Sequence, residues 1–227
     1  MNPFDTIYKY NLWIFGSGSG SIPINNTKYI EFLETFLKDN KIKTVCDLGC
    51  GDWQLGKNID WEGINYLGID SVKTVVENNL KYTKPNIKFI CKDLLNYKIP
   101  NAELYIIKDV LQHLSNTDVT TLISKITKNK YKFILIINDV SNININLNIK
   151  NGMYRPLDLT KSPFNYNLKS IFEYREPLYY ILYIVTLTYL LYITSKNKYK
   201  LYIIALSLYL FYGICILPKK KVYLIEG

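Results

Sequence analysis

The chain has 227 residues and a mass of 26.6 kDa, which is enough for one enzymatic domain with a sizeable core and too little for two. Hydrophobic residues make up 48% of the sequence and charged residues 21%, so the composition excludes a disordered or collagen-like protein. The four cysteines form no CxxC pair and are too sparse for a disulfide-stabilised secreted module. We therefore expect free thiols and no metal site.

The formal net charge of +9 would favour nucleic acid through contacts with phosphate groups. Arg155 and Arg175 are the only arginines, however, and bidentate recognition of phosphate depends on arginine. The sequence is also rich in Asn, Ile, Tyr and Lys and poor in Ala, a bias that A/T-rich coding sequences produce. A nucleic-acid partner therefore stays open but is not favoured.

Residues 1–43 form a predicted N-terminal unit that combines a Gly/Ser segment with a helix. The helix is expected over 27–40, because Leu33, Phe36 and Leu37 fall on one helical face. The Gly/Ser segment, residues 16–21, has the composition of a flexible linker. Its place just before the core also makes it a candidate lid over a ligand.

A predicted core over 44–177 follows, in which short apolar runs alternate with helical spacing. The runs are almost continuously apolar, which is typical of strands covered on both faces. The alternation predicts an α/β fold with a doubly wound, mostly parallel sheet, whose ligand lies beyond the carboxyl ends of the strands. Strands are expected over 44–49, 65–70, 87–93, 103–111 and 133–140, and helices over 71–83 and 116–129.

Aspartates stand at or near the ends of the first four predicted strands, at Asp47, Asp70, Asp93 and Asp109. One such residue is often only a helix cap or a solvated turn residue. Because the carboxyl ends of parallel strands meet at the same edge of a sheet, we expect all four to gather there.

The loop after the first strand begins D-L-G-C-G-D-W at Asp47. Its glycines, Gly49 and Gly51, permit a sharp turn and a close approach of the backbone to a ligand. A GxGxxG dinucleotide fingerprint would need glycine where Gln54 stands, and no Walker lysine follows, so an NAD-dependent reductase is disfavoured. Asp70, about 20 residues downstream, is suited to accept hydrogen bonds from ribose hydroxyls.

In order and spacing, the segments VCDLGCGDW, YLGID, FICKDLLN and IIKDVLQHLSN resemble the motif series of Rossmann-like, class I S-adenosylmethionine-dependent methyltransferases, over roughly residues 27–140. The resemblance implies a seven-stranded sheet, methyl transfer as the activity and S-adenosyl-L-methionine as the cofactor. Where the family has the third glycine of its first motif, this sequence has Trp53. The implied cofactor-binding residues are Asp47, Gly49 and Gly51 for the methionine end, Asp70 for the ribose, Asp93 and Leu94 for the adenine, and Lys108 and Asp109 for the methionyl side.

His113, the only histidine, follows the fourth predicted strand and is a candidate general base, because its ordinary pKa lies near neutrality. A structural role is the alternative, since alignment and water exclusion can themselves support methyl transfer. The Pro-containing loop over 151–165 lies where substrate contacts fall in such a fold. Its charged residues, Arg155 and Asp158, are candidate substrate-binding residues, with an ordinary surface loop as the alternative.

Two uncharged runs of about 18 residues each, 178–195 and 201–218, are long enough to reach across most of the roughly 30 Å hydrocarbon core of a bilayer. They predict a two-helix transmembrane hairpin over 178–217, inserted between two antiparallel edge strands at 170–177 and 218–227. The lipid bilayer is thus an expected partner, and the expected localisation is a membrane, with two spans and the catalytic domain facing the cytosol. Two buried helices of a core are the alternative.

The leading interpretation is a membrane-anchored S-adenosylmethionine-dependent methyltransferase with an unknown acceptor, for which a lipid or a membrane-associated protein is a candidate. One alternative is a non-catalytic binding or scaffold protein that retains the fold. The other is an RNA methyltransferase.

Overall fold

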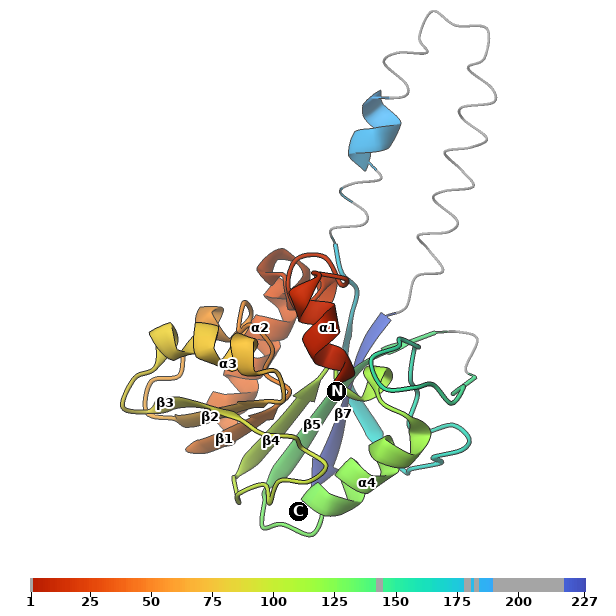
Figure 1. The fold of residues 1–227 in the computed structure, drawn as a ribbon. Coiled ribbons are helices and arrows are strands. Elements are labelled where there is room, and N and C mark those ends of the chain that lie inside the picture. Colours follow the sequence, from red (N-terminus) through yellow and green to blue (C-terminus); the bar gives the residue numbers. More distant parts are fainter. Residues whose placement is uncertain (1, 142–144, 178–180, 182–183, 190–218) are drawn as a thin grey trace, which may run out of the picture.

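The computed structural model describes residues 2–141, 145–177, 181, 184–189 and 219–227, and its centre is one seven-stranded sheet (Figure 1). The strand order is β3-β2-β1-β4-β5-β7-β6. The strands are β1 (Thr44–Leu48), β2 (Asn65–Asp70), β3 (Ile87–Cys91), β4 (Leu104–Lys108), β5 (Phe133–Val140), β6 (Lys169–Tyr174) and β7 (Lys219–Glu226). The longer helices are α1 (Pro3–Lys9), α2 (Pro23–Asp39), α3 (Lys73–Asn79) and α4 (Asn116–Ile126).

The strands β1 to β5 are all parallel, and β7 pairs antiparallel with both β5 and β6. The chain runs outward in one direction from β1 to β3 and in the other from β4, so the order reverses between β1 and β4. A ligand of an open α/β sheet binds at such a reversal, beyond the carboxyl ends of the strands. The predicted doubly wound sheet with an antiparallel edge pair is confirmed.

All four helices differ from the sequence-based expectation: α3 and α4 are shorter than the expected ranges 71–83 and 116–129, and the two helices before the sheet differ as follows. Helix α2 begins at Pro23 instead of Thr27, because proline fits the first turn, where no intrahelical N–H bond is lost. Helix α1 was not predicted; the side chain of Asn2 caps it by accepting from the N–H of Phe4, and Pro3 occupies its first position. Both helices precede the sheet in the chain; α1 lies at its carboxyl edge (Figure 1), whereas α2 packs along one face.

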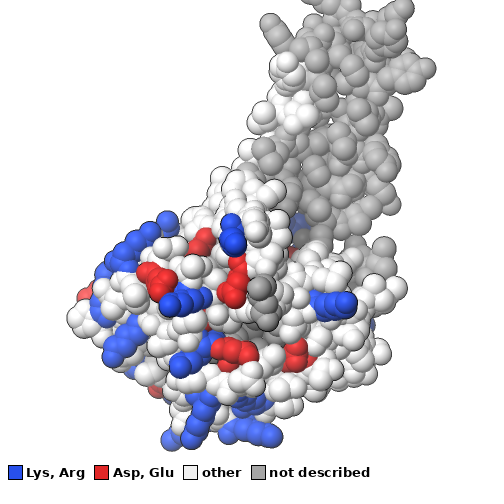
Figure 2. Space-filling view, in the orientation of Figure 1, with Lys and Arg blue, Asp and Glu red and all other residues white. Residues whose placement is uncertain are grey.

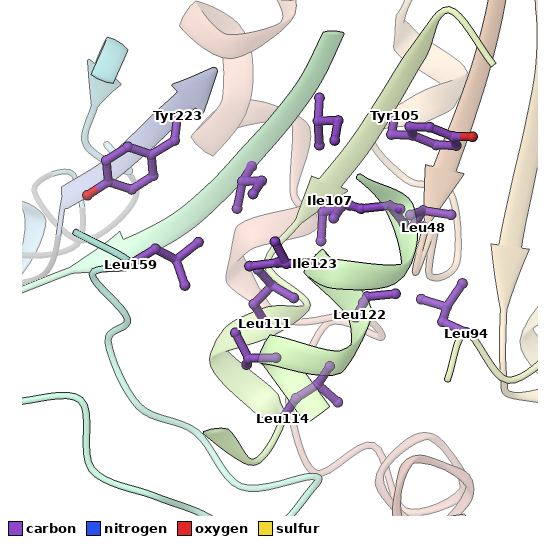
Figure 3. Close-up of a cluster of buried hydrophobic side chains, with 14 of the residues drawn as sticks. Leu48, Leu94, Tyr105, Ile107, Leu111, Leu114, Leu122, Ile123, Leu159 and Tyr223 are labelled. Atoms are coloured by element: carbon purple, nitrogen blue, oxygen red, sulfur yellow. The ribbon is translucent and has the colours of Figure 1, made fainter. Parts of the chain in front are cut away.

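Two apolar cores lie on the two faces of the sheet. On one face, Leu122 and Ile123 of α4 pack against the sheet together with Leu111, and Ile107 and Tyr223 belong to the same cluster (Figure 3). Ser115 caps helix α4, because its hydroxyl accepts from the N–H of Asp118. On the other face, Tyr29 and Leu33 of α2 are buried in a second cluster, together with strand residues that include Val45, Leu104 and Leu135. These cores hold the strand ends in fixed positions.

The transmembrane part of the fold prediction is corrected. Among the residues that the structure describes, none of the helices combines the length and apolar character that a membrane-spanning helix needs. Residues 184–189 are helical, but 178–180, 182–183 and 190–218 lie outside the described residues. The predicted hairpin over 178–217 is therefore not supported, and the fold is the mixed seven-stranded sheet.

Basic side chains on the face shown in Figure 2 are spread over its margins, with acidic side chains between them.

Candidate active site

A cavity of about 550 Å³ opens at the carboxyl ends of β1, β2 and β4. Its walls come from the loops that follow these strands, from the loop after β3, and from the N-terminal residues 2–21. All eight residues that the resemblance assigns to the cofactor line this cavity: Asp47, Gly49, Gly51, Asp70, Asp93, Leu94, Lys108 and Asp109. The structure thus brings together residues that span more than 60 positions of the sequence, while their individual roles stay predictions.

The loop after β1 is held against β2 by Asp70. One oxygen of Asp70 accepts from the N–H of Gly51 and the other from the N–H of Val72, each at 3.0 Å. Burial raises the pKa of Asp70, and these backbone hydrogen bonds oppose the rise. Gly49 has a φ of +84°, and a Cβ there would lie 2.4 Å from Cγ2 of Val110, so only glycine fits this turn.

Trp53, which stands where the resembled motif has a glycine, has a left-handed backbone conformation with a φ of +56°. Its ring does not line the cavity. The ring is buried against Tyr66, Tyr82 and Phe89, with ring centroids between 5.1 and 5.7 Å apart. The side chain of Trp53 therefore fills the core beneath the loop.

Asp47 is a buried carboxylate at the floor of the cavity. Its Oδ2 accepts a hydrogen bond of 2.6 Å from the hydroxyl of Tyr66. Burial raises the pKa of Asp47 to about 6, although the Tyr66 hydrogen bond and the ammonium of Lys108 act in the opposite direction. Asp47 is thus mostly ionised at neutral pH, and it takes up a proton when the pH falls to about 6.

A buried ionic cluster adjoins the cavity on the β4 side. Lys108 pairs with Asp109, and its Nζ also donates to the carbonyl of Gly20 at 2.6 Å. Lys220 of β7 is 3% exposed and pairs with Asp109 at 2.6 Å, Asp139 at 2.9 Å and Glu176 at 3.3 Å. Burial alone would raise the pKa of Asp109, but the two ammonium groups outweigh it and lower this pKa to about 2.

Residues 2–21 form a lid over the cavity, as one interpretation of the Gly/Ser segment expected. The hydroxyl of Ser17 accepts from the N–H of Asp52 at 2.9 Å and shares a hydrogen bond of 2.7 Å with the hydroxyl of Tyr8. The ring of Trp13 lies over His113, with centroids 4.5 Å apart. Gly20 approaches closely enough that a Cβ there would lie 2.5 Å from Oδ2 of Asp109. The lid is therefore fastened at several points to the sheet edge.

His113 lines the cavity beside Trp13, where a proton acceptor can act on a bound molecule. Burial lowers its pKa below the ordinary value, while the carbonyl of Met153 and the charge of Asp109 partly oppose this effect. Nδ1 lies 3.0 Å from the carbonyl oxygen of Met153, and since a carbonyl only accepts, Nδ1 carries the proton. Nε2 of the neutral ring is then free to act as a base.

The two predicted substrate-binding residues lie outside the cavity. Arg155 is 4% exposed and donates to the carbonyls of Leu111 and Gln112 and to Asn116. Asp158 is also buried; it accepts from Thr160 and from the hydroxyl of Tyr223. Both side chains hold the loop after β5 in place, and their role in substrate binding stays a prediction.

Several cavity residues were not found from the sequence. Tyr8, Ser17 and Tyr29 reach the cavity from the segment before the sheet, and Lys220 reaches its ionic cluster from β7. For Ser17 the Gly/Ser composition was a signal of a lid, but the others stand in no recognisable motif. They are distant in sequence from the residues they contact, and only the tertiary structure brings them to the site.

The strand order of the sheet identifies the fold. Five parallel strands are followed by an antiparallel pair, in which β7, the last strand in the chain, lies between β5 and the edge strand β6. The chain has the class I methyltransferase fold. Within this fold the cavity lies where the sequence motifs predicted it, at the reversal between β1 and β4.

No family model matches the chain, and no curated protein matches it. Among solved structures it is similar to magnesium protoporphyrin IX methyltransferase from Synechocystis PCC 6803 with bound SAH, at 18% identity and a TM-score of 0.47 over 54% of this chain and 60% of that one. It is also similar to human N-acetylserotonin methyltransferase in complex with SAM, at 21% identity and a TM-score of 0.40 over 50% and 38% of the two chains. The methyltransferase domain of bacterial CtHen1-C matches at 17% identity and a TM-score of 0.44, over 51% and 66%. The chain thus spans less than two thirds of each of these structures.

Proposed function

We propose that the protein is an S-adenosylmethionine-dependent methyltransferase that binds its cofactor in the cavity at the β1–β4 reversal. The observation that carries this proposal is the charge of the cavity wall. Five aspartates line the cavity, and among the described lining residues they face one lysine and no arginine. Such a wall favours a ligand with positive charge.

S-Adenosylmethionine carries a sulfonium, an ammonium and a carboxylate group, so its net positive charge complements this wall. A nicotinamide dinucleotide carries a negative pyrophosphate, which five carboxylates would repel. The absence of a third fingerprint glycine at Gln54 points the same way. The cavity therefore favours the sulfonium cofactor over the dinucleotide.

The cavity residues after successive strands would bind successive parts of this cofactor. Asp47 would hold the ammonium of the methionine end, and Asp70 would accept from the ribose hydroxyls. Leu94, which is buried beside Asp93, would lie against the adenine. When bound, the cofactor supplies an electrophilic methyl group on a positively charged sulfur.

The chain's own contribution to methyl transfer is alignment, exclusion of water and removal of a proton. The lid covers the cavity and keeps water from the reacting atoms. Nε2 of neutral His113 would take the proton of the acceptor. Phe4, Trp13 and Leu114 line the cavity near His113, so we expect an acceptor with an apolar or aromatic group beside its nucleophilic atom.

The test is calorimetric titration of S-adenosylmethionine into the full-length chain, with NAD as the comparison ligand. We expect saturable binding of S-adenosylmethionine only, and at least tenfold weaker binding by Asp70→Ala. Asp60→Ala is a matched control, because both aspartates accept from the N–H two residues ahead but Asp60 lies outside this cavity. No binding by the folded wild-type chain would overturn the proposal.

Binding without transfer would favour the scaffold alternative. Turnover is measured with radiolabelled S-adenosylmethionine and acceptor pools of three kinds, namely small apolar nucleophiles, proteins and RNA. Label in RNA, together with salt-sensitive RNA binding, would identify the RNA methyltransferase alternative. Label in small apolar nucleophiles is the result that we expect from the apolar side chains of Phe4, Trp13 and Leu114 near His113.

A further inference from the structure

The hydroxyl of Tyr29 is a buried polar group at the cavity that the mechanism above does not use. Tyr29 belongs to α2, is 0% exposed and lines the cavity. Its oxygen has no hydrogen-bond partner among the described residues. Because a buried hydroxyl without a partner is costly, proteins retain such groups mainly where a ligand or another function supplies a reason.

The surroundings of Tyr29 fix its ring and place its hydroxyl among charges. The ring stacks on that of Tyr174, with centroids 5.8 Å apart, and Nζ of Lys108 lies 5.7 Å from its centroid. Burial raises the pKa of Tyr29 well above its ordinary value, and the carboxylates of Asp47 and Asp109 raise it further. The hydroxyl therefore keeps its proton and lies near these two carboxylates, at the end of the cavity assigned to the methionine moiety.

A methionine moiety presents both an ammonium and a carboxylate to this end of the cavity. The ammonium is complementary to Asp47, whose Oδ2 is used by Tyr66 and whose other oxygen can still accept. The carboxylate needs donors, and the donors available nearby are Nζ of Lys108 and the protonated hydroxyl of Tyr29. The two charges of the ligand are thus matched by two kinds of side chain.

We propose that the hydroxyl of Tyr29 donates a hydrogen bond to the α-carboxylate of the bound cofactor and so selects ligands that carry an intact amino-acid end. This inference rests on the proposed function. Tyr29 is a binding residue in this scheme, and it takes no part in the transfer of the methyl group.

The experiment compares two ligands and two variants of the full-length chain by calorimetry. Decarboxylated S-adenosylmethionine keeps the ammonium and sulfonium groups but lacks the carboxylate. We expect Tyr29→Phe to weaken the binding of S-adenosylmethionine about tenfold or more, as loss of a hydrogen bond to a charged group does, and to leave the binding of the decarboxylated ligand unchanged.

Tyr174→Phe is the matched control. It also removes one buried hydroxyl from the same aromatic stack, but that hydroxyl donates to Asn26 at 3.1 Å and does not line the cavity. Without ligand, Tyr174→Phe should lower the melting temperature, whereas Tyr29→Phe should leave it equal or higher, because it removes an unpaired group. This pattern separates a binding role from a structural one.

The outcomes distinguish the two proposals. If the wild-type chain does not bind S-adenosylmethionine, the proposed function fails. If the wild type binds it and Tyr29→Phe binds both ligands as the wild type does, or weakens both equally, the role of Tyr29 is wrong and the proposed function stands.

Discussion

Single residues in the cavity differ from free amino acids because burial changes their acid–base chemistry. Asp47 is the clearest case, with a pKa raised to about 6 by burial. In its ionised form it supplies the negative charge for the ligand's ammonium. As the pH falls through about 6, the carboxyl takes up a proton and that charge disappears.

We therefore expect the affinity for S-adenosylmethionine to fall as the pH is lowered from about 8 to about 5. Since the ligand binds the ionised form, binding near pH 6 should also release a proton, which calorimetry in buffers of different ionisation enthalpy measures. Asp47→Asn should bind more weakly at neutral pH and lose this dependence. An affinity of the wild type that does not change over this range would contradict the role of Asp47.

His113 offers a second test, because it is the only histidine and gives one set of imidazole signals in an NMR titration. Burial should place its pKa below the ordinary value of about 6.5. Trp13→Ala removes the ring that covers it and should move the pKa upward. Tyr10→Ala is the control, since Tyr10 is an exposed aromatic residue of the same segment and should leave the titration unchanged.

At the scale of elements, the lid is an N-terminal segment that contacts the loops after β1 and β4. The hydroxyl of Ser17 joins it to the loop after β1 by accepting from the N–H of Asp52, and a second hydrogen bond, to Tyr8, holds the lid together internally. Because Ser17→Ala removes both contacts, we expect the ligand to dissociate several-fold faster from this variant. Stopped-flow fluorescence measures the rate, and Ser124→Ala on the exposed side of α4 should match the wild type.

Helix α4 owes its position to its buried face. Leu122 is fully buried against the sheet (Figure 3), so Leu122→Ala should lower the free energy of unfolding by about 2–5 kcal/mol. Thr120 lies on the exposed side of the same helix, and Thr120→Ala should change it by less than about 0.5 kcal/mol. Chemical denaturation compares the two. Equal effects would show that α4 does not pack as described.

Elements with a strong apolar pattern were predictable from the sequence, whereas those defined by tertiary contacts were not. The ranges of β2 and β5 agree with the prediction because each is built on a short apolar run, residues 66–69 in β2 and 133–137 in β5, next to polar residues. The prediction placed β4 up to residue 111, but the strand ends at Lys108, since Asp109 has a φ of +59° and turns toward Lys220. Helix α1 has seven residues and one buried side chain, too short a pattern to recognise.

For the molecule as a whole, Lys220 ties the sheet together at its ligand edge. It pairs with Asp109 after β4, Asp139 in β5 and Glu176 after β6. Lys220→Ala leaves these carboxylates buried without their common partner, so we expect a loss of about 3–5 kcal/mol in the free energy of unfolding. Lys73→Ala breaks an exposed pair with Glu77 and should cost at most about 1 kcal/mol. Urea titration at neutral pH measures both.

The sequence predicted that the site lies at the ends of the strands, but it did not predict which distant segments surround the cavity. The four aspartates were visible because each follows an apolar run, and parallel strands bring such residues to one edge. The counter-charge from Lys220, the hydroxyl of Tyr29 and the closing contacts of Ser17 depend on how distant segments fold over that edge. The spacing of residues along the chain does not predict these contacts between distant segments.

The place of β7 between β5 and β6 has a consequence for the order of assembly during synthesis. β6 is translated before β7, yet its only hydrogen-bonded neighbour in the described sheet is β7. A ribosome-bound chain that ends before residue 219 therefore leaves β6 unpaired and lacks the ammonium that neutralises Asp109 and Asp139. The pairing of β6 and of these two carboxylates with Lys220 is therefore completed only when residues 219–226 emerge.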